Sequence, residues 1–341
     1  MSTHNIFFVP VKLEKHPNAD TLSVVRVFGW NVVVKTSEWA SREHGIYIPP
    51  DYVVPDTESF AWLNGHGSGR RIRVRRFRGE MSQGLLVPLE SFPDVDTMKL
   101  VGNIGKVPVG EGMPLDAELY SVKRYEAVNK FITGGEAVSG PNEWCPVYDI
   151  ESWYQHSKLL VPGEEVVITE KIHGANARFT SGFCGSRREW KSNEEGSIYW
   201  KAYNETQGAK SWCECHEPTQ SPYFSRGFVY GEIYGWVQDL RYDMDRGQVK
   251  FAAFDIFDNG RFVDYDVFQN QCRIFKIPMV PELYRGPYDP AQAVALASGQ
   301  STIASHIREG VVIRPVQERQ DSKIGRVILK IVSNEYLEKA Q

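Results

Sequence analysis

Lys171 is the first residue of this sequence whose surroundings suggest chemistry. It lies in the segment TEKIHGAN (169–176), at the end of the β-type run EEVVITE, and Gly174 lets the chain turn tightly behind it. A lysine at a strand end becomes a covalent nucleophile when its pKa falls from about 10.4, which needs desolvation or a neighbouring cation. On this segment alone, a solvated lysine is the simpler interpretation.

Five further motifs follow in order, and in most of them a charged residue lies within or at the end of an apolar strand. Phe254 by itself is most simply a core residue, Asp255 is a metal neighbour or a turn cap, and Glu232 in an apolar strand needs a partner. Nucleotidyl transfer relies on cations and carboxylate-held Mg²⁺, and this set supplies both kinds of side chain. The motifs are GSRR (185–188), YGEIYG (230–235), FAAFDIF (251–257), EGVVIRP (309–315) and RVILK (326–330).

The ordered set resembles the nucleotidyltransferase motifs of the covalent lysyl-AMP ligase superfamily, from Thr169 to Lys330. The variant EKIHGAN, with His173 where DNA ligases and capping enzymes usually carry Asp, is similar to RNA ligases related to the phage RNA ligase 2 group. The resemblance implies that Lys171 attacks the α-phosphorus of ATP, expels pyrophosphate and holds AMP.

The same resemblance implies roles for the other motif residues. The implied catalytic residues are Lys171, His173, Arg187, Glu232, Glu309 and Lys330. Those expected to contact ATP or AMP are Glu170, Lys171, Gly174, Asn176, Arg187, Glu232, Phe254 and Lys330. Glu232 would contact the ribose, Phe254 would stack on adenine, Arg187 would engage ribose or phosphate, and Lys330 would bind the α-phosphate. A divalent cation, Mg²⁺ or Mn²⁺, would be held by Glu309 and Asp255.

Two departures from the family pattern affect these roles. Val332 stands where a second strand lysine often follows Lys330, so Lys330 acts alone, or Lys323 or Arg326 supplies the second cation. His173 replaces the usual Asp, which puts in doubt any metal contact made by that Asp elsewhere.

The N-terminal part resembles oligonucleotide-binding (OB) barrels of the tRNA-binding type through HPNADTL (16–22) and SQGLLVP (82–88). The RNA ligase 5 family places such a domain before its nucleotidyltransferase domain. In GRRIRVRRFRG (69–79), alternation along a strand puts Arg71, Arg73 and Arg75 on one face, which suits a phosphate backbone, and Phe77 is available to stack on a base. The alternative is an edge strand that uses charge for solubility.

We therefore predict an α+β protein of two domains. Residues 1–120 are expected to form an OB-fold β-barrel and residues 121–148 a linker. Residues 149–341 are expected to form a nucleotidyltransferase domain of antiparallel sheets with helices, ATP-grasp-like in architecture. Only eleven residues follow Lys330, so we expect neither a C-terminal OB domain nor a C-terminal helical domain. Helices are predicted over EEGSIYWKAYNETQGAK (194–210) and PAQAVALASGQ (290–300).

Composition excludes several classes. The 341 residues suggest about two domains, and 42% apolar with 24% charged residues is ordinary for a globular protein. No apolar run is long enough to span a membrane, and the N-terminus does not read as a secretory signal. Five scattered cysteines favour a reducing, cytoplasmic compartment. The net charge of −4 averages the arginine-rich strand against carboxylates elsewhere.

The resulting hypothesis is an ATP-dependent RNA ligase that joins 3′-OH and 5′-phosphate ends through lysyl-AMP and a 5′-adenylylated strand. We expect it to act in RNA repair, at nicks in duplexes with an RNA or DNA template, and as a monomer. Two alternatives stay open. One is a DNA ligase or a GTP-dependent capping-type nucleotidyltransferase, and the other is a non-catalytic tRNA- or RNA-binding OB protein.

Overall fold

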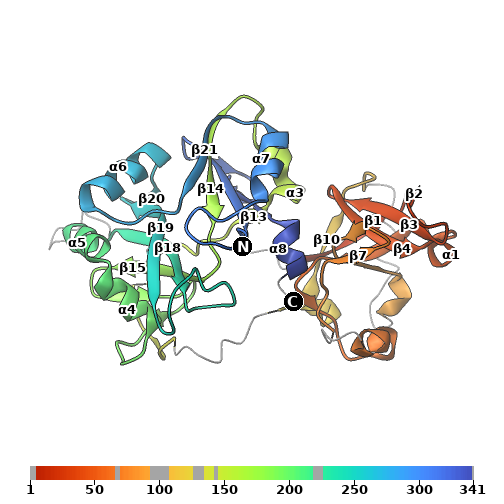
Figure 1. Ribbon diagram of the computed structural model, residues 1–341, viewed down its shortest axis with the longest axis horizontal. Coiled ribbons are helices and arrows are strands. Elements are labelled where there is room, and N and C mark those ends of the chain that lie inside the picture. Colours follow the sequence, from red (N-terminus) through yellow and green to blue (C-terminus); the bar gives the residue numbers. More distant parts are fainter. Residues whose placement is uncertain are drawn as a thin grey trace. The chain divides into compact units, whose positions relative to one another are not determined.

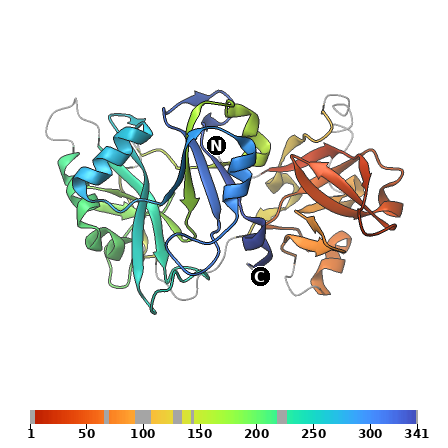
Figure 2. The same cartoon turned by 45° about the horizontal axis from the view of Figure 1, so that its top comes forward.

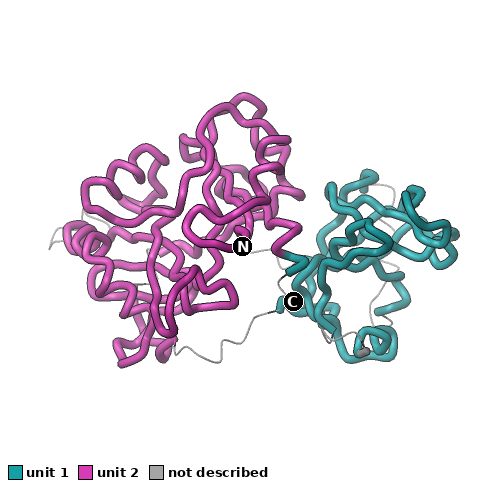
Figure 3. The backbone as a smooth tube through the Cα atoms, viewed as in Figure 1, with its two compact units in different colours: residues 1–127, 337–341 teal, residues 128–336 magenta. Residues whose placement is uncertain are grey.

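The computed structural model describes residues 5–65, 70–92, 107–125, 134–141, 145–217 and 226–339 (Figure 1). The chain divides into two compact units, residues 1–127 with 337–341 and residues 128–336 (Figure 3). The predicted linker, 121–148, falls in part outside the described residues.

The first unit is built from short strands in small antiparallel sheets. One sheet has the order β10-β1-β5-β9, a second has the order β2-β3-β4, and two further sheets have two strands each, the β7-β8 hairpin and the long-range pair β11-β6. Short 3₁₀ helices cover Glu58–Gly65, Leu89–Ser91 and Ala117–Tyr120. In the described part of this unit, the strands and the α-helix are β1 (Asn5–Pro10), β2 (Leu13–Lys15), β3 (Leu22–Val27), β4 (Trp30–Lys35), α1 (Thr36–Trp39), β5 (His44–Ile48), β6 (Tyr52–Val53), β7 (Arg75–Phe77), β8 (Glu80–Ser82), β9 (Leu85–Val87), β10 (Met113–Asp116) and β11 (Lys123–Arg124).

Strand β1 is apolar at successive positions instead of alternating between apolar and polar residues. Ile6 and Phe8 enter one hydrophobic cluster, whereas Phe7 and Val9 enter another on the opposite face. Both faces of the strand are therefore buried, as in a barrel or sandwich whose sheets enclose two sides of a core.

The second unit contains two antiparallel sheets that carry the predicted motifs (Figures 1 and 2). The larger has the order β12-β17-β16-β15-β18-β19-β20, and the smaller the order β13-β25-β22-β14-β21, in which only β13 and β25 pair in parallel. The strands are β12 (Ala137–Val138), β13 (Glu151–Ser152), β14 (Glu165–Lys171), β15 (Ala175–Thr180), β16 (Phe183–Gly185), β17 (Trp190–Lys191), β18 (Phe228–Gly235), β19 (Val249–Asp258), β20 (Arg261–Phe262), β21 (Glu282–Pro287), β22 (Gly310–Pro315) and β25 (Leu329–Val332), with a separate pair β23 (Gln320–Asp321) and β24 (Gly325–Arg326).

Both predicted helical stretches of this unit are helical, and α3, α6 and α8 are helices that were not predicted. The stretch predicted as one helix over 194–210 forms two, α4 (Ile198–Glu205) and α5 (Gln207–Cys215). The second predicted helix is α7 (Pro290–Ala297), where Asp289 caps the amide of Ala291 at 2.9 Å and Pro290 occupies the first turn. The others are α3 (Trp153–His156), a 3₁₀ turn at Ser157–Leu159, α6 (Tyr265–Phe275) and α8 (Asn334–Lys339).

Strand β14 lies between two cores and so fixes where Lys171 points. Val167 belongs to the cluster of the seven-stranded sheet, whereas Val166 and Ile168 pack on the other side with α7. Since side chains alternate along a strand, Lys171 shares the face of Val167, toward the larger sheet.

Candidate active site

Lys171 and Glu309 form an ion pair where two neighbouring strands meet. Strand β14 ends at Lys171, which lies opposite Gly310 at the start of β22. The Lys171 Nζ is 2.7 Å from Oε1 and 2.8 Å from Oε2 of Glu309. Only 8% of the surface of Glu309 is exposed, so its charge depends on protein partners.

His173 completes a charged cluster around this ion pair. Its Nδ1 lies 3.5 Å from Glu309 Oε2, and its Nε2 lies 2.6 Å from Asp239 Oδ1. Burial acts to lower the pKa of His173, but the two carboxylates outweigh it and raise the value to about 9. Burial acts to raise the pKa of Glu309, but Lys171 and His173 hold it at about 2. His173 and Glu309 are therefore both ionised at neutral pH.

Glu232 comes to the same cluster from the larger sheet. It lies on β18 opposite Asn176 of β15. Burial raises the pKa of Glu232 to about 7, with the Glu309 charge adding to the shift and Lys171 opposing it. The buried Oδ1 of Asn176 has no hydrogen-bond partner among the described residues, so it is able to accept one from a ligand.

Close packing explains the glycine three residues after Lys171. A Cβ placed on Gly174 would lie 2.0 Å from the carbonyl oxygen of Ile233 and 3.1 Å from the Cγ of Glu232. Any side chain here would push the turn after Lys171 away from the strand that carries Glu232. The glycine therefore serves a close approach, since its φ is not in the left-handed region.

Lys330 and Phe254 border the same face of the smaller sheet. Lys330 pairs with Val312, and Val312 pairs with Thr169, so all three project on the Lys171 side. Phe254 is half-buried in one cluster with Val312, and its ring centroid lies 4.7 Å from that of Tyr148. An apolar surface thus adjoins the charged cluster.

The register also places the residue that replaces the second strand lysine. Val332 lies opposite Gly310, which in turn lies opposite Lys171. A lysine at 332 would share the face of Lys171 and add a cation there, and this chain has an apolar side chain instead.

Two predicted residues have different surroundings from those expected. Glu170 points away from Lys171, and its buried carboxylate accepts hydrogen bonds from Ser301 Oγ at 2.5 Å and from the amide and hydroxyl of Thr302, each at 2.8 Å. Its side chain therefore anchors the segment before Glu309 and does not reach the face expected to hold the nucleotide.

Asp255 is the fully buried centre of an ion cluster. Its oxygens lie 3.1 Å from Arg314 and 2.7 Å from Arg326, and Tyr148 donates to it at 2.8 Å. Although burial acts to raise it, these two arginines keep the pKa of Asp255 below its usual value. Because both oxygens are occupied, we do not retain Asp255 as a metal ligand. Arg326, considered above as a second phosphate-binding cation, is used in this cluster.

Several residues at the site have no counterpart in the predictions. Asp239, which pairs with His173, lies in the β18–β19 loop, and Tyr336 on α8 has its hydroxyl 3.3 Å from the His173 ring nitrogens.

Arg187, which was predicted, pairs with Asp149 at 2.9 Å. Among the described residues, no group of three or more His, Cys, Asp or Glu side chains is arranged to hold a metal ion.

Comparison with known proteins decides the family. Residues 164–332 match the RNA ligase family model, and residues 10–89 match an OB-fold domain model. The domain over residues 164–332 belongs to the RNA ligase family. It is therefore a ligase, and the predicted order of an OB-fold domain followed by a ligase domain is confirmed. A comparison with curated proteins found no significant match.

Solved structures of the Naegleria gruberi RNA ligase are similar to this RNA ligase over nearly the whole chain. A variant with ATP and manganese is 20% identical, with 98% of each chain covered and a TM-score of 0.77. The same enzyme with pyrophosphate is 21% identical, with 98% of each chain covered and a TM-score of 0.77. An apo variant is 20% identical, with 99% of each chain covered and a TM-score of 0.78. At this identity the likeness establishes the fold.

In the OB unit of this ligase, the arginine-rich segment is only partly a strand. Strand β7 covers Arg75–Phe77, whereas Arg71 makes an isolated bridge with Val53, so the expected single strand through 69–79 is not formed in the described part. Arg71 pairs with Asp51 at 2.6 Å. Burial and the charges of Arg71 and Arg75 lower the pKa of Arg73, which shows that these cations lie close together.

The HPN part of the HPNADTL motif holds the β7–β8 hairpin. His16 is fully buried and its Nε2 lies 3.0 Å from the carbonyl oxygen of Phe77, while Asn18 donates to the carbonyl of Arg78 at 3.1 Å. Arg78 and Gly79 both have left-handed backbones, with φ of 50° and 91°, as in a type I′ hairpin turn. The Phe77 side chain beside this turn is 41% exposed.

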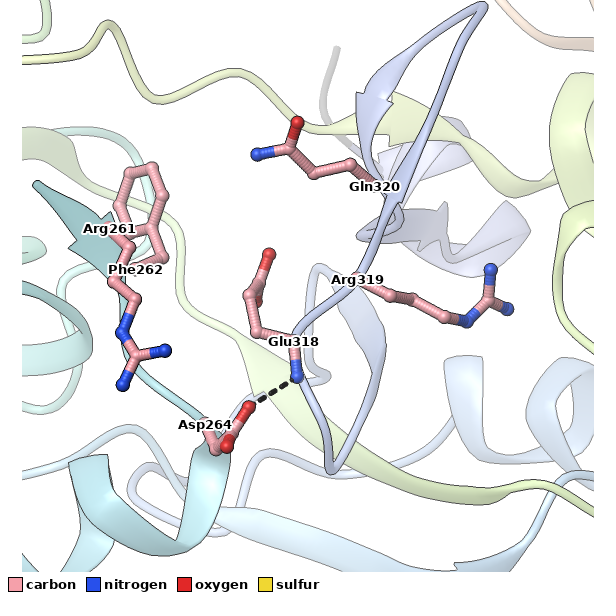
Figure 4. Close-up of a pocket in the computed structure, with 6 residues that line it drawn as sticks. All are labelled: Arg261, Phe262, Asp264, Glu318, Arg319 and Gln320. Carbon is pink, nitrogen blue, oxygen red and sulfur yellow. Dashed lines mark hydrogen bonds between the residues drawn. The ribbon is translucent and has the colours of Figure 1, made fainter.

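A cavity of about 240 Å³ lies elsewhere in the second unit (Figure 4). It is lined by Arg261, Phe262, Asp264, Glu318, Arg319 and Gln320, none of which is a predicted site residue. The Glu318 amide donates a hydrogen bond to Asp264 at 2.7 Å, and the Glu318 carboxylate belongs to the Asp255 ion cluster.

No helix in the described part of the chain is long and apolar enough to cross a membrane.

Proposed function

We propose that this RNA ligase uses ATP to join RNA 3′-OH and 5′-phosphate ends at nicks in duplexes, as an RNA-repair enzyme. The observation that carries the proposal is the Lys171–Glu309 ion pair, with both charges held at the ends of paired strands beside Glu232 and His173. We further propose an OB domain of about residues 1–120 and a nucleotidyltransferase domain of about 149–341. The five free cysteines support an intracellular, reducing compartment.

The first step is transfer of AMP to Lys171. The unprotonated Nζ attacks the α-phosphorus of ATP, an N–P bond forms, the bond from that phosphorus to the bridging oxygen breaks, and pyrophosphate leaves as Nζ loses a proton. An ammonium paired with Glu309 is not a nucleophile, so the ion pair has to open before attack.

A divalent cation fits Glu309. Carboxylate oxygens are the ligands that Mg²⁺ and Mn²⁺ prefer, and Mg²⁺ commonly uses only one or two carboxylates together with substrate phosphates. Glu309 is buried, Glu232 is half-buried, and both have Lys171 as a cationic neighbour; with its pKa held at about 2, Glu309 offers a negative charge to a cation. Glu309 would hold this cation, which would supply positive charge beside the α-phosphate.

The nucleotide would lie across the face that bears Lys171. We propose that Phe254 stacks on the adenine and that Glu232 accepts a hydrogen bond from the ribose. Arg187 and Lys330 would bind ribose or phosphate. Asn176 offers its unpartnered side-chain oxygen to the same ligand. The half-buried, apolar setting of Phe254 beside Val312 supports the adenine assignment.

Two steps on nucleic acid complete the proposed reaction. A 5′-phosphate oxygen attacks the phosphorus of lysyl-AMP and Nζ leaves with a proton, which gives a 5′-adenylylated strand. A 3′-OH then attacks the 5′-phosphorus and AMP leaves. Arg71, Arg73 and Arg75 would bind the phosphate backbone, and Phe77, held by His16, would stack on a base.

The test of the proposal is adenylylation followed by nick sealing. Wild type incubated with α-labelled ATP and Mg²⁺ or Mn²⁺ should gain a covalent AMP adduct that Lys171→Ala lacks, and should seal a nick with an RNA 3′-OH. Labelling with GTP in place of ATP would indicate a capping-type enzyme. Equal sealing of an all-DNA nick would indicate a DNA ligase, and RNA binding without any adduct would indicate a non-catalytic protein.

A further inference from the structure

The β18–β19 loop, residues 236–248, holds the turn that follows Lys171. Gln238 Nε2 donates to the Gly174 carbonyl oxygen, and the Tyr242 hydroxyl accepts from the His173 amide at 2.6 Å. Asp239 Oδ1 lies 2.6 Å from His173 Nε2. Three side chains of one loop thus bind both peptide and side-chain groups within three residues of the nucleophile.

The same loop also holds the segment that leads to Glu309. The Asp243 carboxylate accepts hydrogen bonds from the Ser305 amide at 2.6 Å and from the Ser305 hydroxyl at 2.7 Å. The Tyr242 ring packs edge-on against His306, with centroids 4.6 Å apart. The loop is therefore bonded to both chain segments whose ends carry the Lys171–Glu309 ion pair.

The backbone of this loop is in a conformation that its residues seldom adopt. Tyr242 and Asp243 have φ of 52° and 54°, in the left-handed region that favours glycine. The two residues in this conformation are the ones whose side chains reach His173 and Ser305. Strained backbone held in place by its surroundings is typical of functional sites.

The loop itself is fixed independently of these contacts. The guanidinium of Arg241 lies 3.7 Å from the Trp236 ring centroid, and Trp236 Nε1 donates to the Met244 carbonyl at 3.0 Å. Tyr242 is only 3% exposed. A loop held in this way is able to transmit its position to the segments bonded to it.

We propose that Gln238, Asp239 and Tyr242 are positioning residues for Lys171, and that Asp243 positions the segment before Glu309. By fixing these two segments relative to one another, the loop sets where Nζ lies when the ion pair opens for attack. This inference rests on the proposed adenylylation of Lys171. It predicts that loop variants lose rate in that step rather than affinity for ATP.

The experiment compares variants that remove single contacts. Tyr242→Phe removes only the hydroxyl that binds the His173 amide, Asp239→Ala removes the carboxylate, and Asp239→Asn keeps an acceptor for His173. Asp245→Asn is the matched control, since this exposed residue of the same loop bonds within the loop to Gln248. For each variant, single-turnover lysyl-AMP formation is measured over a range of ATP concentrations, and Tm is measured in parallel.

Tyr242→Phe and Asp239→Ala should lower the maximal rate about 10- to 100-fold, since a displacement of ~1 Å at a reacting group costs about 100-fold. Half-saturating ATP should change less than about threefold, which is the signature of an interaction that acts in the transition state. Asp239→Asn should recover most of the rate, and Asp245→Asn should match wild type. Maximal rates for Tyr242→Phe and Asp239→Ala within about twofold of wild type would overturn the proposal.

A second measurement does not depend on activity. Hydrogen exchange of the His173 amide should be about tenfold or more faster in Tyr242→Phe than in wild type and Asp245→Asn, because its acceptor is gone. Unchanged exchange would overturn the positioning role even if wild type forms no adduct. Absence of the adduct in wild type, with faster exchange in the variant, would instead count against the proposed function alone.

Discussion

Nε2 of His173 lies 2.6 Å from Oδ1 of Asp239, while Nδ1 of the same ring faces Glu309 at 3.5 Å. The ring thus lies between two carboxylates, one at the ion pair and one in the β18–β19 loop. Opposite charge on both sides favours the imidazolium, and the pKa of His173 rises to about 9 despite burial, which acts to lower it.

This relationship predicts a pH-dependent stability. A group whose folded-state pKa exceeds its unfolded value of about 6.5 stabilises the fold fully below that value and loses this contribution as pH rises through the folded pKa. The free energy of unfolding of the metal-free protein should therefore fall between pH 6.5 and about 9, where the folded pKa lies. His173→Gln should lack this component, on the order of 2 kcal/mol. Urea titrations at several pH values measure it, and parallel curves for both proteins would contradict it.

Lys171→Ala should separate the first step from the last. The variant should form no AMP adduct, because it lacks the Nζ that attacks the α-phosphorus in the proposed first step. It should still join a strand that already carries 5′-AMP, since that step needs no lysyl-AMP. The exposed Lys250 on β19 provides a control, and Lys250→Ala should adenylylate as wild type. Loss of both steps in Lys171→Ala would show that the lysine also acts in sealing.

Glu309→Gln should change the metal dependence of adenylylation, whereas Asp255→Asn should not. Glu309→Gln removes the proposed ligand charge, so half-saturating Mn²⁺ in adenylylation should rise about tenfold or more. Asp255→Asn leaves Arg314 and Arg326 without their shared buried partner, which should cost about 3–5 kcal/mol of stability. At a temperature where it is folded, its Mn²⁺ dependence should match wild type. A raised Mn²⁺ requirement in Asp255→Asn would restore it as a ligand.

Gly174→Ala should impair the site through a steric clash. The added Cβ would lie 2.0 Å from the Ile233 carbonyl oxygen, so the turn after Lys171 has to move. We expect adenylylation to fall at least about 100-fold, the scale of loss for a displacement of ~1 Å at a reacting group. Gly163→Ala is a control for glycine removal in the same unit, with no atom within 4 Å of the added Cβ. Its left-handed φ of 84° should cost some stability, so rates are compared per folded protein.

The sequence identified Lys171 and Glu309 as charged residues at the ends of strongly apolar strands, but it did not predict their ion pair, because it does not show that these two strands are neighbours. It did not reveal the partners of Asp255. The alternation of side chains along FAAFDIF predicts which of them share a face of the strand, but it does not predict which charged residues from other elements pack against that face. Asp239 and Tyr242 were missed for a related reason: a polar loop carries no periodicity, and their contacts depend on left-handed backbone at Tyr242 and Asp243. The arginine-rich segment does not form one strand because its two halves pair with different neighbours: the backbone of Arg70 and Ile72 hydrogen-bonds to residues 51–54, whereas Arg75–Phe77 pairs with Glu80–Ser82.

The exposed ring of Phe77 yields the last prediction, which concerns nucleic acid alone. Stacking of a base on an aromatic ring is worth about 1–3 kcal/mol, so Phe77→Ala should weaken binding of nicked RNA about 5- to 100-fold. His16→Ala should weaken it as well, because the Phe77 carbonyl loses the ring that holds the hairpin. Lysyl-AMP formation by both variants should equal wild type. Leu119→Ala, at another exposed apolar side chain of this unit, is the control and should bind normally. Equal affinities for all four proteins would mean that the β7–β8 hairpin does not contact the substrate, whereas a loss confined to His16→Ala would trace the effect to barrel stability instead.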